Sequence, residues 1–418
     1  MSSKKLFLSI TVLFVLFSSP LAILVEAEPS WVVWSQTYGG IKEDCANSLI
    51  ETSDGGYALA GTTRSFGAGE EEFWLVKIDG SGNMEWNHTY GGGEVTSLVE
   101  TSDRGYALAG GARLVKTDEY GNMEWNQTYG EGDIRSLVET VDGGYALAGK
   151  TATFVTGIDD YGNFWLIKTD AYGNMEWNRT YGGEDYDYAS ALVKASDGGD
   201  ALAGSTYSFG AGNHDVWLVK TDAYGSVEWN KTYGGTGDDV AFSLVHTSDG
   251  GYALAGSMYP IGGAEDFWLI KVDGYGDMEW NGTYGEGADF DVAYALIETF
   301  DGGYALAGGT GSFSIDEYDV WLVKTDANGN MEWNCTYGGE KGDIAYSLVE
   351  SSTGGYALAG STRSFGSGDE DFWLIKTNEQ GVPEFPSWTP LLITLVAPVT
   401  VAVVYRRKLS QSKERGGN

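Results

Sequence analysis

The chain has 418 residues, of which 62 are Gly, 42% are hydrophobic and 20% are charged. Sixty acidic residues outnumber 25 basic ones, and the formal net charge of −35 argues against nucleic acid as a partner, because a phosphate backbone requires basic residues to neutralise it. The apolar content excludes a disordered polyanion, the lack of a Gly-X-Y period excludes collagen, and two cysteines cannot form a disulfide framework.

Residues 1–27 are predicted to be a secretory signal peptide. Two lysines near the N-terminus precede an almost wholly apolar run from Leu6 to Val25, and small residues stand at the −3 and −1 positions of a cleavage site after Ala27. An uncleaved N-terminal anchor is the alternative.

A repeat of about 50 residues fills residues 28–382. The phrase Trp-Asn-x-Thr-Tyr-Gly or a close variant occurs seven times, at intervals of 51 to 53 residues and one of 39. Each unit holds four short β-like runs bounded by turn residues; in the first unit they are 48–52, 57–61, 73–78 and 84–90. Since four strands in about 50 residues make one propeller blade, the sequence predicts an all-β, seven-bladed β-propeller of four-stranded blades.

The phase of the repeat predicts that the propeller closes on itself. The last unit stops after its third strand, and the repeat region begins with a lone fourth strand over residues 31–38. That strand can complete the last blade and cover an exposed sheet edge. The pattern resembles the β-propeller repeats of secreted and surface proteins of bacteria and archaea. The resemblance implies the fold and says little about activity, because propellers host many functions.

Thirteen of the 15 Trp occupy two repeated positions, where they could form a carbohydrate-stacking platform or pack one blade on the next. Recurrence in nearly every blade favours packing.

The repeated Lys and Glu of one hairpin, such as Lys77 and Glu85, are expected to form surface pairs. Cys45 and Cys335 are expected to be free thiols, because two blades separate them.

Unit 2 is shorter than the others by 13 residues, mostly between its second and third strands, which predicts a notch on one face of the ring.

The sequence offers no catalytic residues. The three His occupy different positions of the repeat, and no nucleophile elbow, dinucleotide fingerprint, P-loop or zinc pattern is present. An enzyme is therefore the less favoured interpretation.

Six Asn-x-Thr sequons lie on the predicted fourth strands, and N-glycosylation of a secreted chain is expected there. The sites are Asn87, Asn126, Asn178, Asn230, Asn281 and Asn334.

Acidic residues crowd the face that carries the connections between second and third strands and between blades. Like charges so close together predict a site for a basic partner or for weakly bound Ca²⁺, the only cofactor that the sequence suggests, near the notch of unit 2. The residues named for this face are Glu70, Glu71, Glu72, Asp238, Asp239, Asp316, Asp369, Glu370 and Asp371.

The C-terminal region predicts a membrane anchor. In residues 383–405 the apolar run from Trp388 to Tyr405 would rise about 27 Å as a helix, close to the thickness of a hydrocarbon core. The basic residues of 406–418 predict a cytoplasmic tail and place the propeller outside the cell. Together with Pro383-Glu384-Phe385, this arrangement resembles the PEF-type sorting signal of archaeal surface proteins. The resemblance implies processing by an archaeosortase, with another anchor replacing the helix.

These features together indicate a propeller at the cell surface that acts in binding, in adhesion or as a structural part of the envelope. The expected partner is a surface glycan or an envelope protein, besides the membrane itself. A surface hydrolase or lyase acting on polysaccharide is the alternative.

Overall fold

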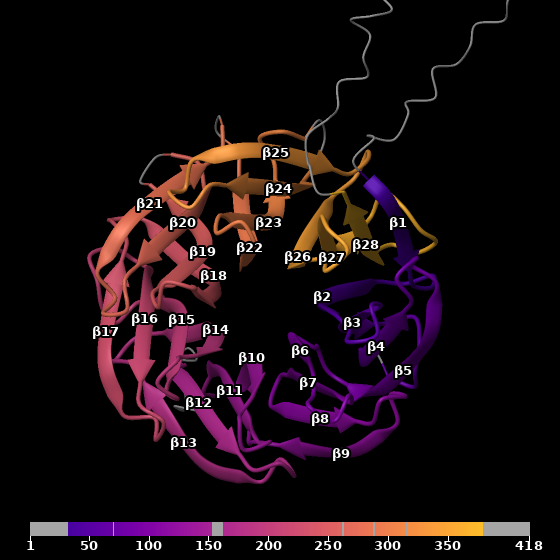
Figure 1. The fold of residues 1–418 in the computed structure, drawn as a ribbon, viewed down its shortest axis with the longest axis horizontal. Helices are drawn as coiled ribbons and strands as arrows, with labels where there is room; N and C mark the ends of the chain where they lie inside the picture. The colour runs from indigo at the N-terminus through magenta and orange to yellow at the C-terminus, as the bar shows by residue number, and fades with distance from the viewer. Residues whose placement is uncertain are drawn as a thin grey trace, which may run out of the picture. The chain divides into compact units, whose positions relative to one another are not determined.

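The repeat folds into seven four-stranded sheets arranged as blades around a central axis, as predicted (Figure 1). The structure is a computed structural model and describes residues 32–69, 71–152, 162–260, 263–286, 289–314 and 317–378. The strands are β1 (Val32–Tyr38), β2 (Asp44–Glu51), β3 (Tyr57–Thr63), β4 (Glu72–Ile78), β5 (Met84–Gly92), β6 (Ser97–Glu100), β7 (Tyr106–Gly110), β8 (Arg113–Thr117), β9 (Met123–Thr128), β10 (Asp133–Glu139), β11 (Tyr145–Lys150), β12 (Phe164–Thr169), β13 (Met175–Tyr181), β14 (Asp187–Lys194), β15 (Asp200–Thr206), β16 (Asp215–Thr221), β17 (Val227–Tyr233), β18 (Asp238–His246), β19 (Tyr252–Tyr259), β20 (Asp266–Val272), β21 (Met278–Tyr284), β22 (Asp291–Glu298), β23 (Tyr304–Thr310), β24 (Asp319–Thr325), β25 (Met331–Tyr337), β26 (Asp343–Glu350), β27 (Tyr356–Thr362) and β28 (Asp371–Thr377).

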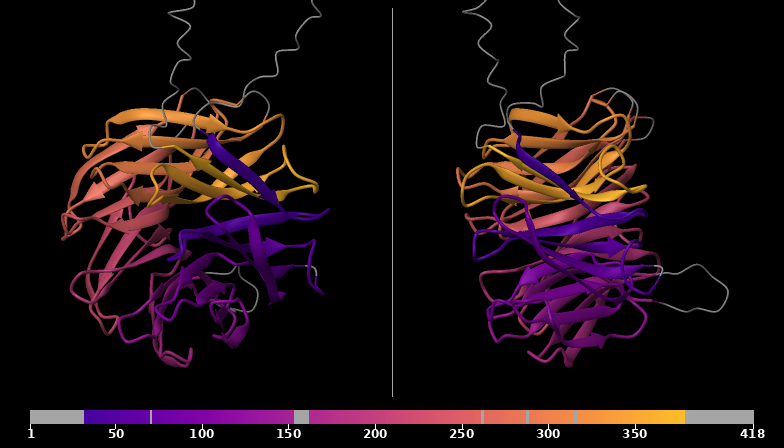
Figure 2. Two further views of the ribbon diagram at one scale, coloured as in Figure 1. Left: turned by 45° about the vertical axis from the view of Figure 1, so that its right-hand side comes forward. Right: turned by 90° about the vertical axis from the view of Figure 1, so that its right-hand side faces the viewer.

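In blades 1 to 6 the strand order follows the chain, from an inner strand near the axis to an outer strand at the rim. The two tight hairpins of each blade lie on one face, here called the hairpin face. The connections from second to third strand and from blade to blade lie on the opposite face, here called the loop face (Figure 2). The first inner strand, β2, begins at Asp44, earlier than the predicted residue 48, because the backbone at Asp44 pairs with Thr63 of β3 and is buried there.

The ring closes through the N-terminal strand, which confirms the prediction from the phase of the repeat. In the last blade the strand order is β1-β28-β27-β26, so β1 takes the outer position (Figure 1). Figure 2 shows β1, in indigo, beside the yellow strands from the other end of the repeat. The outer edge of β28 is therefore covered by a strand of the same chain, which removes a site for edge-to-edge aggregation.

Neighbouring blades interlock through large side chains on one face and small ones on the other. At the boundary of blades 7 and 1, Trp74 of blade 1 packs against Phe372 of blade 7, with ring centroids 4.5 Å apart. Ala357 and Ala359 of blade 7 leave room for this contact. The third-strand Trp is buried in each of the six blades that have one, which confirms the packing role. Each buried side chain of this size contributes about 1.5–3 kcal/mol.

A repeated hydrogen bond joins each outer strand to the next blade. The hydroxyl of Tyr38 donates to the carbonyl of Gly82 at 2.8 Å, and five further outer-strand Tyr make the same bond. Gly82 has φ +84° and lies under the ring of Trp34, so a side chain there would be strained and would clash. Tyr337 lacks this bond, because blade 7 takes its fourth strand from the N-terminus and has no equivalent hairpin.

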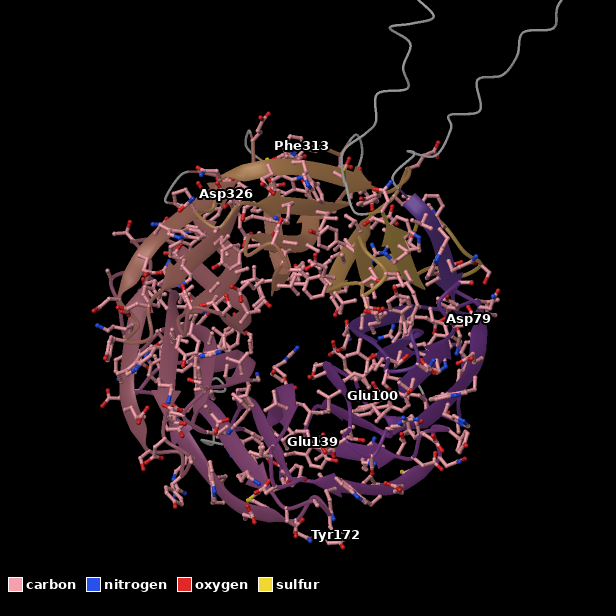
Figure 3. The ribbon with its side chains drawn as sticks, in the orientation of Figure 1. Asp79, Glu100, Glu139, Tyr172, Phe313 and Asp326 are labelled. Carbon is pink, nitrogen blue, oxygen red and sulfur yellow. The ribbon has the colours of Figure 1, made fainter. Side chains whose placement is uncertain are left out.

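On the hairpin face, the Glu that ends an inner strand binds the preceding blade. Glu100 accepts hydrogen bonds from the amide and hydroxyl of Ser53 at 2.9 and 2.7 Å, and Glu139 binds Ser102 in the same way (Figure 3). Figure 3 shows both Glu toward the inner side of the ring. Glu51 makes this contact with Ser352 across the closure, so the first and last blades are joined at their inner as well as their outer strands.

The repeated Lys of the third strand is buried, so the expectation of surface pairs is wrong in this respect. Lys77 Nζ lies 3.0 Å from Glu85 Oε2, as the hairpin predicts, and 3.0 Å from Asp54 Oδ2 of the other hairpin in its blade. It also donates to the Ile78 carbonyl, and the Lys77 side chain is only 4% exposed. The spacing of Lys77 and Glu85 along one hairpin could not show that Asp54 of the other hairpin also lies against the ammonium group.

Removing residues 32–38 should leave β28 as an open edge and lower the thermal unfolding midpoint. The truncated protein should also form oligomers, because the exposed strand can pair with another chain. Differential scanning calorimetry and light scattering measure both effects. A synthetic peptide of residues 31–40 should restore the monomer, whereas a scrambled peptide should not. A truncated chain that remains monomeric and equally stable would contradict closure by β1.

Acid should remove part of the stability that the ion pairs of the repeated Lys provide. The hydrogen bond from Thr140, together with that from Lys168, outweighs partial burial and lowers the pKa of Asp142 to about 2. Because the folded-state pKa lies below the unfolded one, this stability is present above about pH 4 and is lost as the pH falls toward 2. Urea unfolding should show that Asp142→Asn lowers the midpoint at pH 5 and has a smaller effect at pH 2. Equal losses at both pH values would exclude this linkage.

Candidate functional site

One position of the inner strand differs from blade to blade, although its neighbours are nearly copied. In all seven units the residue two places after this variable position is Leu, and the residue directly before it is Ala, Val or Ile. The position between them holds polar, basic and aromatic residues. Its seven occupants, in blade order, are Asn47, Thr96, Arg135, Ser190, Phe242, Tyr294 and Tyr346.

In six blades this variable residue is the extra residue of a β-bulge. In blade 6, for example, Ala293 pairs with Gly308 and Ala295 with Ala307, so Tyr294 has no partner in the ladder. The same register shift occurs in the inner strands of blades 1, 3, 4, 5 and 7. A bulge re-aims a side chain that a regular strand would direct into the blade. All seven variable residues accordingly line one cavity of about 590 Å³, here called the axial cavity.

One side of the axial cavity is aromatic. Phe242, Tyr294 and Tyr346 of blades 5, 6 and 7 form a row, with successive ring centroids 5.1 Å apart. Burial raises the pKa of Tyr294 and Tyr346, so both hydroxyl groups stay protonated at neutral pH. The row offers apolar area together with hydroxyl groups that can donate and accept hydrogen bonds.

The opposite side is polar, and its side chains are held by the next blade or by their own strand. Asn47 Nδ2 donates to the Val95 carbonyl at 2.7 Å, and Thr96 Oγ1 donates to the Ile134 carbonyl at 2.8 Å. Arg135 forms an ion pair with Asp133 at 2.7 Å. These side chains are thus positioned before any ligand binds.

Blades 3 and 4 contribute the rim of the cavity on the loop face. Lys150 Nζ lies 3.2 Å from the Tyr186 hydroxyl and 5.2 Å from the centre of its ring. His214 Nδ1 lies 3.1 Å from Asp238 Oδ1, and its ring packs on Tyr207 with centroids 3.7 Å apart. Cationic and aromatic groups therefore alternate along this rim.

The predicted notch is present in blade 2. Strands β7 and β8 are joined by only two residues, Gly111 and Ala112, and Glu94 and Thr96 of this blade line the axial cavity. Arg113 occupies the place of the missing Trp and lies 4.8 Å above the ring of Phe73. The notch thus adjoins the cavity, but a basic residue stands at its edge.

The residues predicted for the acidic face do not all reach the solvent. Glu71, Asp238 and Asp369 are exposed or half-exposed, and Glu370 is an ion-pair partner of Arg363 at 3.2 Å. Glu70 and Asp316 lie outside the described residues. The prediction is wrong about the exposure of three others, which are buried at the starts of strands: Glu72, Asp239 and Asp371.

The buried acids at strand starts bind the backbone of their own loops. Asp371 Oδ2 accepts the amides of Ser367 and Gly368 at 2.8 and 2.9 Å. Burial raises the pKa of Asp319 to about 6, and the neighbouring Asp343 adds to the shift. These carboxylates shape the loop face rather than offering free charge to a partner. Among the described residues, no three His, Cys, Asp or Glu side chains come together as a metal site.

All six sequon Asn residues lie exposed on outer strands, far from the axial cavity, and their glycosylation stays a prediction. In five blades the Asn also has a structural partner: Trp74 Nε1, for example, donates to Asn87 Oδ1 at 3.1 Å. Blade 2 has Arg113 at the Trp position, so Asn126 has no indole donor.

The predicted sorting residues Pro383, Glu384 and Phe385 and the apolar run after them lie outside the described residues. No helix in the described ranges has the length and apolar character needed to cross a membrane. Neither Cys45 nor Cys335 forms a disulfide, as expected.

Comparison with solved structures supports the fold. The WD40 β-propeller domain of Doa1 matches with a TM-score of 0.54 and 15% identity, over 84% of this chain and 98% of that one. The WD40 domain of Pan2 from Neurospora crassa matches with a TM-score of 0.52 and 10% identity, over 80% and 89%. No family profile and no curated protein sequence matches the chain. The chain is therefore similar to WD40-type β-propellers in fold.

The sequence reasoning missed the axial cavity, although a signal was available. Aligning the seven units would have shown one variable column between columns that hardly change. The charge of the acidic loops is visible in the amino-acid composition, whereas a β-bulge is not.

The Trp–Asn hydrogen bond predicts different costs for two equivalent substitutions. Asn87→Ala should destabilise the propeller by about 1–2 kcal/mol, because it leaves the buried Trp74 indole N–H without an acceptor. Asn126→Ala is the matched control and should cost less than about 0.5 kcal/mol. Urea unfolding of protein from a host without N-glycosylation measures both. Equal costs would show that the indole bond does not contribute.

Proposed function

We propose that this chain is a cell-surface binding module that receives its partner on the loop face, at the axial cavity. The observation that carries the proposal is the set of seven variable inner-strand residues, six of which lie at a β-bulge. The scaffold around them is repeated almost unchanged, and the residues that differ converge on one cavity. Folding alone requires no such difference between blades.

The cavity has the size and composition of a binding site. Its volume of about 590 Å³ falls within the range of roughly 300–1,000 Å³ that is usual for ligand pockets. Tyr and Arg, which dominate the energetics of protein interfaces, stand on opposite walls as Tyr294 and Arg135. Both are positioned by a bulge in an inner strand, so little ordering is needed on binding.

An envelope protein is the favoured partner, and a surface glycan is the other candidate. Propellers of WD40 type commonly act as protein-interaction modules, and two WD40 domains share this fold. The exposed acid Glu94 lines the cavity, and Glu43 and Asp369 are exposed elsewhere on the loop face, which favours basic residues next to the group that enters the cavity.

The location outside the cell rests on the terminal sequences. The predicted signal peptide, the sorting motif and the C-terminal apolar run support secretion followed by anchoring at the membrane. Glycans on the six sequon Asn would occupy the rim of the ring and leave the axial cavity accessible, because the outer strands are farthest from the axis (Figure 1).

Substitution in the cavity should abolish binding without unfolding the propeller. Tyr294→Ala should weaken the affinity for a partner captured from the cell envelope by roughly thirtyfold, the effect of a hot-spot residue worth about 2 kcal/mol. Arg135→Ala should have a comparable effect. Capture on the immobilised protein, followed by mass spectrometry and a glycan array, identifies the partner, and biolayer interferometry measures the affinity.

Tyr275→Ala is the matched control, because Tyr275 is 76% exposed on the hairpin face. It should leave the affinity unchanged. If Tyr294→Ala and Arg135→Ala bind as the unsubstituted protein does, the axial cavity is not the binding site. Turnover of a polysaccharide by the purified protein would favour the hydrolase or lyase alternative.

A further inference from the structure

A second, smaller cavity adjoins the axial cavity on the loop face and is here called the side pocket. Its volume is about 330 Å³, and Tyr294 lines both cavities. Glu265 of blade 5 and Gly309 of blade 6 also line it. The rest of the lining is aromatic or aliphatic and comes from blades 6 and 7: Phe290, Val292, Tyr294, Tyr318 and Ile344.

Two positions that line the side pocket are polar in most other blades. Gly309 pairs with Val292 in the ladder of blade 6. The residues at this position in blades 1, 4, 5 and 7 are Thr62, Ser205, Ser257 and Ser361. Tyr318 directly precedes the third strand of blade 6. The residues at that position in blades 1, 4, 5 and 7 are Glu71, His214, Glu265 and Glu370. The pocket is therefore a feature of one blade and not of the repeat.

The backbone does not require a glycine at 309. Gly309 is not among the residues with positive φ, and a methyl group on it would lie 3.5 Å from Ile344 Cγ1, an ordinary van der Waals distance. A larger residue would thus be accepted by the strand, and its side chain would extend toward Ile344, which lines the pocket. The glycine leaves that space open.

The aromatic residues at the entrance are held in place but remain partly exposed. The ring of Phe290 stacks on Tyr259 with centroids 6.4 Å apart and planes 8° from parallel. The Tyr318 carbonyl accepts the amide of Asp343 at 2.7 Å. Phe290 is nevertheless 45% and Tyr318 40% exposed. A ligand that covers them gains the free energy of apolar burial with little ordering of the protein.

One carboxylate stands at this otherwise apolar site. Glu265 lines the pocket and is half-buried. Burial raises the pKa of Tyr294, and the nearby charge of Glu265 adds to the shift. The site therefore offers an apolar space next to a negative charge, which favours an apolar group that is followed by a cation.

We propose that the side pocket takes one large apolar side chain, such as Phe or Leu, from a protein partner that carries Lys or Arg next to it. This inference rests on the proposed function and adds to it the chemistry of the partner. A volume of about 330 Å³ lies at the lower end of the usual range for ligand pockets and suits a single side chain. A glycan fits less well, because its hydroxyl groups would be buried against mostly apolar residues without partners.

The test uses the full chain in a mild detergent, with the amide of acetyl-4-fluorophenylalanyl-lysine as the probe. Titration followed by ¹⁹F NMR should show binding with a dissociation constant of about 1 mM, because the probe buries one aromatic ring and forms one exposed ion pair. The same dipeptide with glutamate in place of lysine should bind about fivefold more weakly, since attraction to Glu265 becomes repulsion. Equal binding of the two dipeptides would contradict the requirement for a basic neighbour.

Gly309→Val fills the pocket without removing any contact. It should weaken dipeptide binding by roughly tenfold or more and leave the thermal unfolding midpoint unchanged or higher, because Val adds apolar contact and favours a strand. Ser257→Val places the same side chain at the equivalent position of blade 5, outside the lining of the pocket, and should leave the affinity within about twofold. Loss of affinity without loss of stability excludes unfolding as the cause.

Glu265→Gln should weaken the binding of the lysine dipeptide by about threefold and leave that of the glutamate dipeptide unchanged or tighter. Glu286→Gln is the matched control, because Glu286 is an exposed acid of the loop face that does not line the pocket. It should leave both affinities within about twofold.

The partner captured from the envelope separates failure of the side pocket from failure of the proposed function. Arg135 lines the axial cavity but not the side pocket, so Arg135→Ala should weaken only the partner, whereas Gly309→Val should weaken partner and dipeptide. If Gly309→Val changes neither affinity, or if the dipeptide does not bind, the side-pocket proposal is overturned, even where Arg135→Ala still weakens the partner. If Gly309→Val weakens the dipeptide and no variant weakens the partner, the side pocket stands as a binding site and the proposed function fails.

Discussion

Packing between blades is the constraint on which the rest of this structure depends. A four-stranded sheet of this sequence is apolar on both faces, and the second and third strands are buried almost throughout. No blade can therefore exist alone, and each is stable only when it lies between two others. A ring satisfies that requirement for every blade, provided that its ends meet. The strand order β1-β28-β27-β26 makes them meet, because the first strand of the ring belongs to the last blade.

The same constraint determines where sequence variation is tolerated. Residues that face a neighbouring blade, such as Trp74 and Ala357, must complement each other in size and are copied from unit to unit. The variable residue of the inner strand lies outside the buried cluster at each blade boundary and lines the axial cavity. Its identity can change from Asn47 to Tyr294 without disturbing a blade boundary. The ring thus combines a repeated scaffold with a lining that holds six residue types in seven blades.

Many of the charged side chains of the fold hold the scaffold together instead of facing the solvent. The repeated Lys, represented by Lys77, is stabilised in the blade by two carboxylates and a backbone carbonyl. On the loop face, carboxylates such as Asp371 accept hydrogen bonds from loop amides. They are buried and therefore add no charge to the surface. A substantial part of the acidity therefore organises the backbone. Among the described residues the arrangement is incomplete at Asp239 and Asp319, each of which has a buried carboxylate oxygen without a hydrogen-bond donor. At Asp239, Met258 replaces the Thr found in four other blades.

The sequence by itself determined the number of blades, their four strands and the closure, because the 50-residue period and the offset at its ends are visible in the order of residues. It also indicated that the Trp residues pack blades and that the two cysteines do not form a disulfide. It could not show that Lys77 is buried, that Asp239 and Asp371 are hidden, or that Tyr294 and Arg135 share one cavity. Those facts depend on contacts between hairpins and between blades, and on a bulge that changes the direction of one side chain in six of the inner strands. Such contacts join residues far apart in the chain, so only the tertiary structure decides them.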